Sequence, residues 1–62
     1  MPYVNVRVAG NLTADQKREI ARGISRTLLE VADKKPETTY VVFDEVDREN
    51  WAVGENLLSD HR

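Results

Sequence analysis

The chain opens with a segment in which apolar and polar positions alternate. Valine occupies positions 4, 6 and 8 and alternates with Tyr3, Asn5 and Arg7. Alternation with a period of two and β-branched residues is typical of a strand whose two faces meet different surroundings. Because Gly10-Asn11 interrupts the alternation, we predict a strand over residues 2–9.

A segment with helical periodicity follows. Thr13 and Gln16 match the capping-box pattern of a helix N-terminus, and Asp15 adds negative charge to the first turn. Apolar or small residues then recur at spacings of three and four, which predicts an amphipathic helix. This stripe comprises Ile20, Ala21, Ile24, Thr27, Leu28 and Val31. We expect Pro36 to end the helix, just after a pair of lysines that suits the C-terminal end of the helix dipole.

Residues 38–44 are rich in β-branched and aromatic types, which predicts a second strand. A strand, a helix of about five turns and a second strand form a βαβ unit. Its strands should run parallel, with a right-handed crossover. Beyond this unit the pattern weakens, and residues 49–54 resemble a turn or short hairpin. We therefore predict a single α/β domain over residues 1–62.

The size of the chain makes self-association an expectation. A domain of 62 residues buries a small share of its surface and is marginally stable alone. The chain has no cysteine, which excludes disulfides and thiolate metal sites, and its one histidine, His61, is expected to lie in a solvated tail. A single helix covers one face of the sheet, so another copy of the chain is expected to cover the other face.

Charge and hydropathy exclude several classes of partner. The formal net charge of −2 at pH 7 leaves no basic footprint for nucleic acid. No apolar run is long enough for a membrane span, and no secretory signal is recognisable, so we expect a cytoplasmic protein. The acidic residues between positions 44 and 49 lack the ligand order of a calcium loop. We predict that they form a solvated acidic turn and that the chain has no metal site.

Candidate chemistry begins at Pro2, which directly follows Met1. A methionine before proline is normally removed by aminopeptidase, and the removal would leave Pro2 with a free secondary amine. An α-amino group titrates at about 7.7–8.0 in short peptides, and an apolar pocket would lower this pKa towards the value that suits a general base. The alternative is that Pro2 merely starts an edge strand, where a missing N–H does no harm.

Together these features resemble the 4-oxalocrotonate tautomerase family over essentially the whole length. The likeness rests on Pro2 at the start of a strand and on three further segments. These are Leu12-Thr13-Ala14-Asp15-Gln16-Lys17, Val41-Val42-Phe43-Asp44-Glu45-Val46 and Asn50-Trp51-Ala52-Val53-Gly54-Glu55. The resemblance implies a β-α-β subunit with two parallel strands, one crossover helix and a short C-terminal hairpin. It also implies assembly into a homohexamer, a trimer of dimers.

The resemblance further implies a tautomerase, an isomerase without metal or cofactor. Pro2, freed from Met1, would act as general base and then general acid. It would interconvert the enol and keto, or unsaturated oxo, forms of a small carboxylic acid, while Trp51 keeps the pocket dry. Family members that process dicarboxylates hold them with two arginines, and Leu12 and Tyr40 stand at the matching positions. Neither forms a bidentate bond to a carboxylate, so a dicarboxylate substrate is not implied.

Other side chains compete to hold the substrate. Arg7 is on the strand of Pro2, on the face opposite the valines, and Arg48 is close to Trp51 in the chain. The arginines at positions 18, 22 and 26 stand beside glutamates, which is more typical of a solvated helix face with charged pairs. The Tyr40 phenol could donate a hydrogen bond to the substrate or pack at a subunit contact. The predicted substrate-binding residues are Trp51, Tyr40 and Arg7.

Two rival functions remain open from the sequence. One is a hydratase or dehalogenase of a haloacrylate-type acid, in which protonated Pro2 donates a proton while water attacks. That chemistry needs a carboxylate or tyrosine to activate the water. The other is an oligomeric scaffold that keeps the fold without catalysis.

Overall fold

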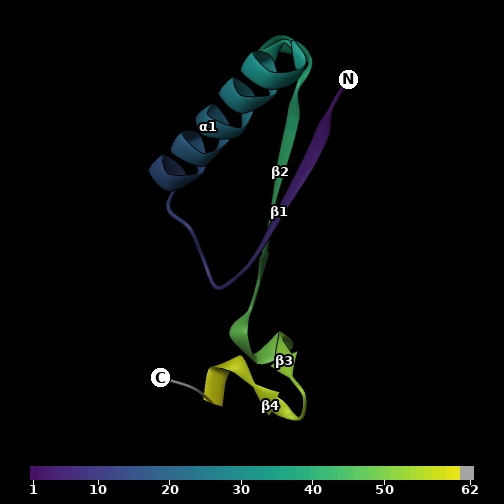
Figure 1. Ribbon diagram of the computed structural model, residues 1–62. Helices are drawn as coiled ribbons and strands as arrows, with labels where there is room; N and C mark the ends of the chain where they lie inside the picture. The colour runs from purple at the N-terminus through teal and green to yellow at the C-terminus, as the bar shows by residue number, and fades with distance from the viewer. Residues whose placement is uncertain (61–62) are drawn as a thin grey trace.

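The computed structural model describes residues 1–60 and shows a helix lying along one face of a two-stranded parallel sheet (Figure 1). Strand β1 spans Tyr3–Ala9, helix α1 spans Ala14–Ala32 and strand β2 spans Tyr40–Val46. The register pairs Tyr3 with Tyr40 and continues to Ala9 with Val46. The predicted βαβ unit is confirmed, although β1 begins one residue later than predicted, at Tyr3, and β2 begins and ends two residues later than the pattern of β-branched residues indicated.

Helix α1 begins as predicted and ends earlier. The Thr13 Oγ1 accepts a hydrogen bond from the Gln16 N–H at 3.1 Å, and the Gln16 Oε1 accepts one from the Thr13 N–H at 2.9 Å. The helix ends at Ala32 because Asp33 adopts a left-handed backbone conformation with φ 55°. The expectation that Pro36 ends the helix was wrong: the two lysines lie beyond its end, and Pro36 begins a short turn of 3-10 helix.

The helix packs on the valine face of the sheet. Its half-buried apolar residues are Ile20, Ala21, Ile24 and Leu28, and those of the sheet are Val4, Val6, Val8, Val41 and Phe43. Thr27 and Val31 are exposed, so their assignment to the stripe was wrong. Two strands lie only about 5 Å apart. A sheet this narrow can cover only one row of side chains on the helix. None of the described side chains is fully buried.

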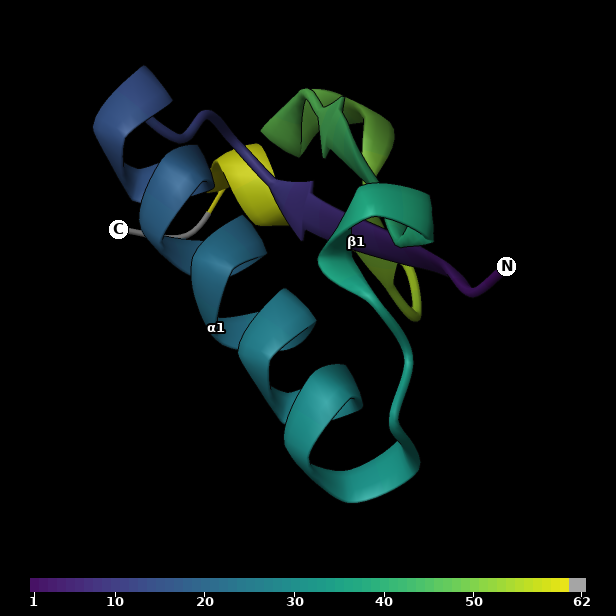
Figure 2. The same ribbon diagram turned by 90° about the horizontal axis from the view of Figure 1, so that it is seen from above.

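Within residues 1–60, no α-helix lies on the opposite side of the sheet, as the view from above shows (Figure 2). Residues in register on parallel strands point to the same side, so this open face is defined by alternate positions of both strands. It comprises Tyr3, Asn5, Arg7, Ala9, Tyr40, Val42, Asp44 and Val46. Tyr3, Tyr40 and Val42 remain 62%, 55% and 45% exposed. The predicted placement of Arg7 opposite the valines is confirmed.

A small antiparallel hairpin projects beyond the end of β2, away from the helix (Figure 1). It consists of β3 (Ala52–Val53) and β4 (Asn56–Leu57). Gly54 has φ 62° and is the first of the two loop residues, a position at which type II′ hairpin turns require positive φ. The predicted hairpin is confirmed; His61 lies outside the described residues. Within residues 1–60, no helix has the length and apolar character needed to cross a membrane.

Glu45 ties the start of α1 to the end of β2. Its Oε1 accepts a hydrogen bond from the Lys17 Nζ at 2.8 Å, and its Oε2 accepts one from the Leu12 backbone N–H at 2.8 Å. These bonds, with the Lys17 bond foremost, lower the pKa of Glu45 against a smaller opposing effect of desolvation. The prediction of a solvated acidic turn was therefore wrong for Asp44 and Glu45, which belong to β2 and form ion pairs.

Glu45→Gln is expected to flatten the acid dependence of stability. Because the folded chain lowers the pKa of Glu45, its contribution is present above the ordinary value of 4.5 and is lost as the pH falls through the folded pKa. Thermal unfolding measured across this range should show a steeper loss in the wild type than in Glu45→Gln. The control Glu55→Gln makes the same charge change in the hairpin turn and should behave as the wild type. Equal slopes for Glu45→Gln and the wild type would contradict this role.

Candidate functional site

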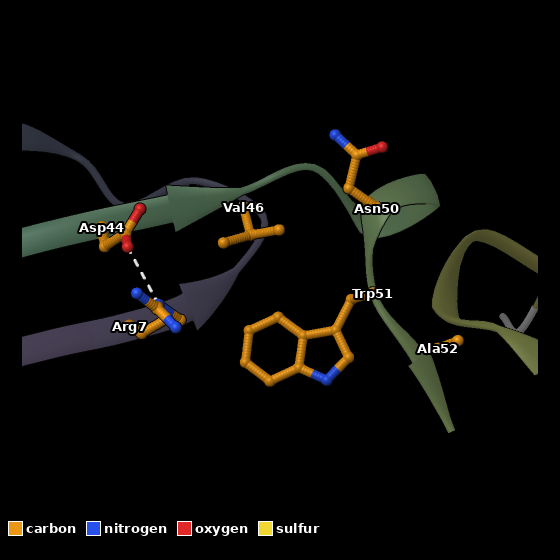
Figure 3. Close-up of a pocket in the computed structure, with 6 residues that line it drawn as sticks. All are labelled: Arg7, Asp44, Val46, Asn50, Trp51 and Ala52. Atoms are coloured by element: carbon orange, nitrogen blue, oxygen red, sulfur yellow. Dashed lines mark hydrogen bonds and ion pairs between the residues drawn. The ribbon is translucent and has the colours of Figure 1, made fainter. Parts of the chain in front are cut away.

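A pocket of about 500 Å³ lies where the open face meets the hairpin (Figure 3). It is lined by Arg7, Asp44, Val46, Asn50, Trp51 and Ala52. The strands supply the first three residues because they alternate onto the open face. A 3-10 turn over Arg48–Asn50 supplies Asn50, and Trp51 and Ala52 follow it.

Backbone hydrogen bonds hold Trp51 directly after this turn. Its N–H donates to the Arg48 carbonyl at 3.4 Å, and its carbonyl accepts from the Leu58 N–H at 2.9 Å. The indole is half-buried and extends from the hairpin towards the ends of the strands, with Val46 and Arg7 beside it (Figure 3). Its ring therefore forms a flat apolar wall of the pocket.

Arg7 and Asp44 form an ion pair on the strand side of the pocket. The Arg7 Nε lies 2.9 Å from the Asp44 Oδ2, and the two side chains are 62% and 40% exposed (Figure 3). An exposed pair of this kind contributes only about 0–1 kcal/mol to stability. Its importance lies in the arrangement of charge: a guanidinium and a carboxylate face the same cavity.

Pro2 and Tyr40 lie at the opposite end of the sheet. The half-buried Pro2 accepts a hydrogen bond at its carbonyl from the Tyr40 N–H, at 2.9 Å. Its nitrogen is bonded to Met1, which is 83% exposed. A strand rises about 3.3 Å per residue, so Pro2 and Arg7 are about 16 Å apart along β1. One chain thus brings the four predicted site residues together as two separate pairs, Pro2 with Tyr40 and Arg7 with Trp51.

Three of the competing arginines have structural partners. Arg18 pairs with Asp15 and Arg22 pairs with Glu19 on the exposed face of α1, one turn apart. The expected solvated helix face is confirmed, with pairs at a spacing of three instead of four. The Arg48 Nη2 donates to the Leu58 carbonyl at 3.0 Å and so braces the hairpin.

Asp44 is the charged pocket residue that sequence reasoning missed, along with the uncharged Val46, Asn50 and Ala52. It was assigned to a solvated turn because it stands in a run of acidic residues. Its spacing from Tyr40 places both on one face of a strand, which was a usable signal. Its partnership with Arg7 depends on the register between two strands that are far apart in the chain, and no local pattern reports that register.

Comparison with known proteins identifies relatives along the whole chain. A family model described as a tautomerase enzyme matches residues 2–61. The probable tautomerase K2 of Dickeya dadantii is 36% identical over 63 aligned positions, which cover 100% of this chain and 94% of the relative. The 2-hydroxymuconate tautomerase of Bacillus subtilis is 30% identical, and the alignment covers 97% of each chain.

Solved structures agree with this relationship. The crystal structure of DmpI from Helicobacter pylori superposes with a TM-score of 0.85 at 26% identity and covers 95% of this chain and 92% of its own. A structure from a study of trans-3-chloroacrylic acid dehalogenase activity gives a TM-score of 0.77 at 28% identity, covering 90% and 98%. With a matching family model and full-length relatives, this chain belongs to the tautomerase family, in its 4-oxalocrotonate tautomerase-like branch.

Proposed function

We propose that the protein is a tautomerase that uses the amine of Pro2 to interconvert the enol and keto, or unsaturated oxo, forms of a small carboxylic acid. The observation that carries the proposal is the place of Pro2. It is half-buried, directly precedes β1 and directly follows the exposed Met1, in a chain of the tautomerase family. Loss of Met1 converts its amide nitrogen into a basic secondary amine.

The reaction then needs only proton transfer. The Pro2 nitrogen accepts the proton of the enol hydroxyl, the C–O bond becomes a carbonyl, and the enol double bond shifts its electrons to carbon. The protonated Pro2 returns the proton to that carbon, and the amine is again neutral. The redox state does not change, so the chemistry requires no redox cofactor.

The site is completed between copies of the chain. Pro2 and Trp51 stand at opposite ends of one sheet, the open face exposes two tyrosines and Val42, and none of the described side chains is fully buried. We propose a homohexamer, a trimer of dimers, that covers the open face. In it, Pro2 and Tyr40 of one copy meet the pocket of Arg7 and Trp51 of another.

Intact mass and ketonisation kinetics test the proposal together. Purified protein should lack the mass of Met1 and should ketonise phenylenolpyruvate or 2-hydroxymuconate. Native mass spectrometry should show the hexamer. A mature chain that keeps Met1 and yet catalyses the reaction would overturn the role of Pro2. A chain that lacks Met1 but acts on no enol or haloacrylate would favour a scaffold.

A second activity, hydration of a 3-haloacrylate, is favoured by two findings together. These are the structural relative from the dehalogenase study and the carboxylate of Asp44 in the pocket. Asp44 would take a proton from water, the hydroxide would add to the halogen-bearing carbon, and protonated Pro2 would give its proton to the neighbouring carbon. Loss of hydrogen halide from the product would leave an aldehyde. Chloride release that disappears in Asp44→Asn, with ketonisation retained, would demonstrate this activity.

A further inference from the structure

The pocket of Arg7 and Trp51 carries a balanced pair of charges. Arg7 has five N–H donors, and its Nε–H is engaged by the Asp44 Oδ2 at 2.9 Å. The two terminal nitrogens of the guanidinium can hold one carboxylate. The second oxygen of Asp44 can accept a hydrogen bond from a ligand hydroxyl. The ion pair therefore offers one anion site and one acceptor site, side by side.

The remaining walls of the pocket are largely apolar. Trp51, Val46 and Ala52 supply the apolar lining, and Asn50 adds an amide that carries no charge (Figure 3). Arg7 is the only cationic side chain among the described lining residues. A second carboxylate on the ligand would have to lie against these walls or beside Asp44. In the first position the second carboxylate would lose water without gaining a cationic partner. In the second position it would be repelled by the carboxylate of Asp44.

We propose that the Arg7–Asp44 pair makes this pocket select acids with one carboxylate and an apolar or aromatic body, and reject dicarboxylates. The proposal rests on the proposed function only in taking this pocket as the substrate site. Asp44 acts as a specificity-determining residue: it neutralises Arg7 and repels a second carboxylate. The preferred substrate is then the enol of an aryl- or alkyl-substituted 2-oxo acid.

Binding can be measured without turnover because Trp51 is the only tryptophan of the chain. We would titrate the assembled protein with 3-phenylpropionate and with adipate, a monocarboxylate and a dicarboxylate of similar length, and follow indole fluorescence. The wild type should bind 3-phenylpropionate about tenfold more tightly, the equivalent of one modest interaction. In Asp44→Asn the ratio should fall to near one or invert, because the freed Arg7 and the loss of the negative charge favour adipate.

Asp47→Asn is the matched control, since it removes the same charge just outside the pocket and should keep the wild-type ratio. Should Asp44→Asn fail to assemble, Asp44→Ser provides the same measurement. Equal affinities in the wild type, no fluorescence response to either acid, or an unchanged ratio in the Asp44 variant would each overturn the inference. Turnover by Pro2→Leu tests the proposed function separately. If that variant remains active while the ratio of the two affinities is unchanged, the proposed role of Pro2 is wrong and the proposed selectivity of the pocket still holds.

Discussion

Pro2→Leu is expected to lower kcat for ketonisation of phenylenolpyruvate by about 10²–10⁴-fold, the usual contribution of a general acid–base group. A large residue after Met1 blocks removal of the methionine, so position 2 would keep an amide nitrogen that cannot carry the proton. The KM should change little, because Pro2 acts on the reacting atoms and the pocket residues remain. Stopped-flow kinetics with freshly prepared enol measure this loss of kcat, and intact mass shows whether Met1 is retained.

Pro2→Ala provides the matched comparison. Alanine after Met1 still permits removal of the methionine, so this variant presents a free primary amine at the same place. Its activity should lie between those of the wild type and Pro2→Leu, because the amine is retained while the rigid ring that fixes its direction is lost. Equal activity of Pro2→Leu and the wild type would contradict the mechanism, as would a Pro2→Ala variant less active than Pro2→Leu.

Val42→Glu is expected to dissociate the assembly and unfold the chain. Val42 lies on the open face between Tyr40 and Asp44 and is 45% exposed in a single copy. A charge buried there without a partner costs several kcal/mol, and Asp44 on the same face adds repulsion. A total stability of about 5–15 kcal/mol is typical of proteins, and a free subunit here has no fully buried side chain among those described. Native mass and circular dichroism should report dissociation and unfolding together.

Val31→Glu is the control for this experiment. It makes the same substitution at an apolar residue that is 82% exposed on the last turn of α1. Its expected cost is below about 1 kcal/mol, from helix propensity and the dipole. The assembly should therefore persist. If Val42→Glu stays assembled and as stable as Val31→Glu, or if the wild type is a folded monomer, the open face is no interface.

The local patterns predicted the elements well and their ends less well. The alternation of valines located β1, and the Thr13–Gln16 capping box located the start of α1, because both signals lie within a few neighbouring residues. The end of α1 depends on Asp33, whose left-handed conformation is uncommon for a residue other than glycine. Pro36 was the stronger signal in the sequence, and it lies after the helix has already ended.

The family and the candidate base were accessible from the sequence because they depend on the order of residues along the chain. The sequence by itself determined that a strand follows Pro2, that Arg7 faces away from the valines and that a single helix crosses between two parallel strands. Only the tertiary structure decided that Arg7 pairs with Asp44, that Trp51 joins them and that Pro2 lies at the far end of the sheet. Side-chain periodicity reports the face of an element, whereas the register between distant strands is set by packing of the whole fold.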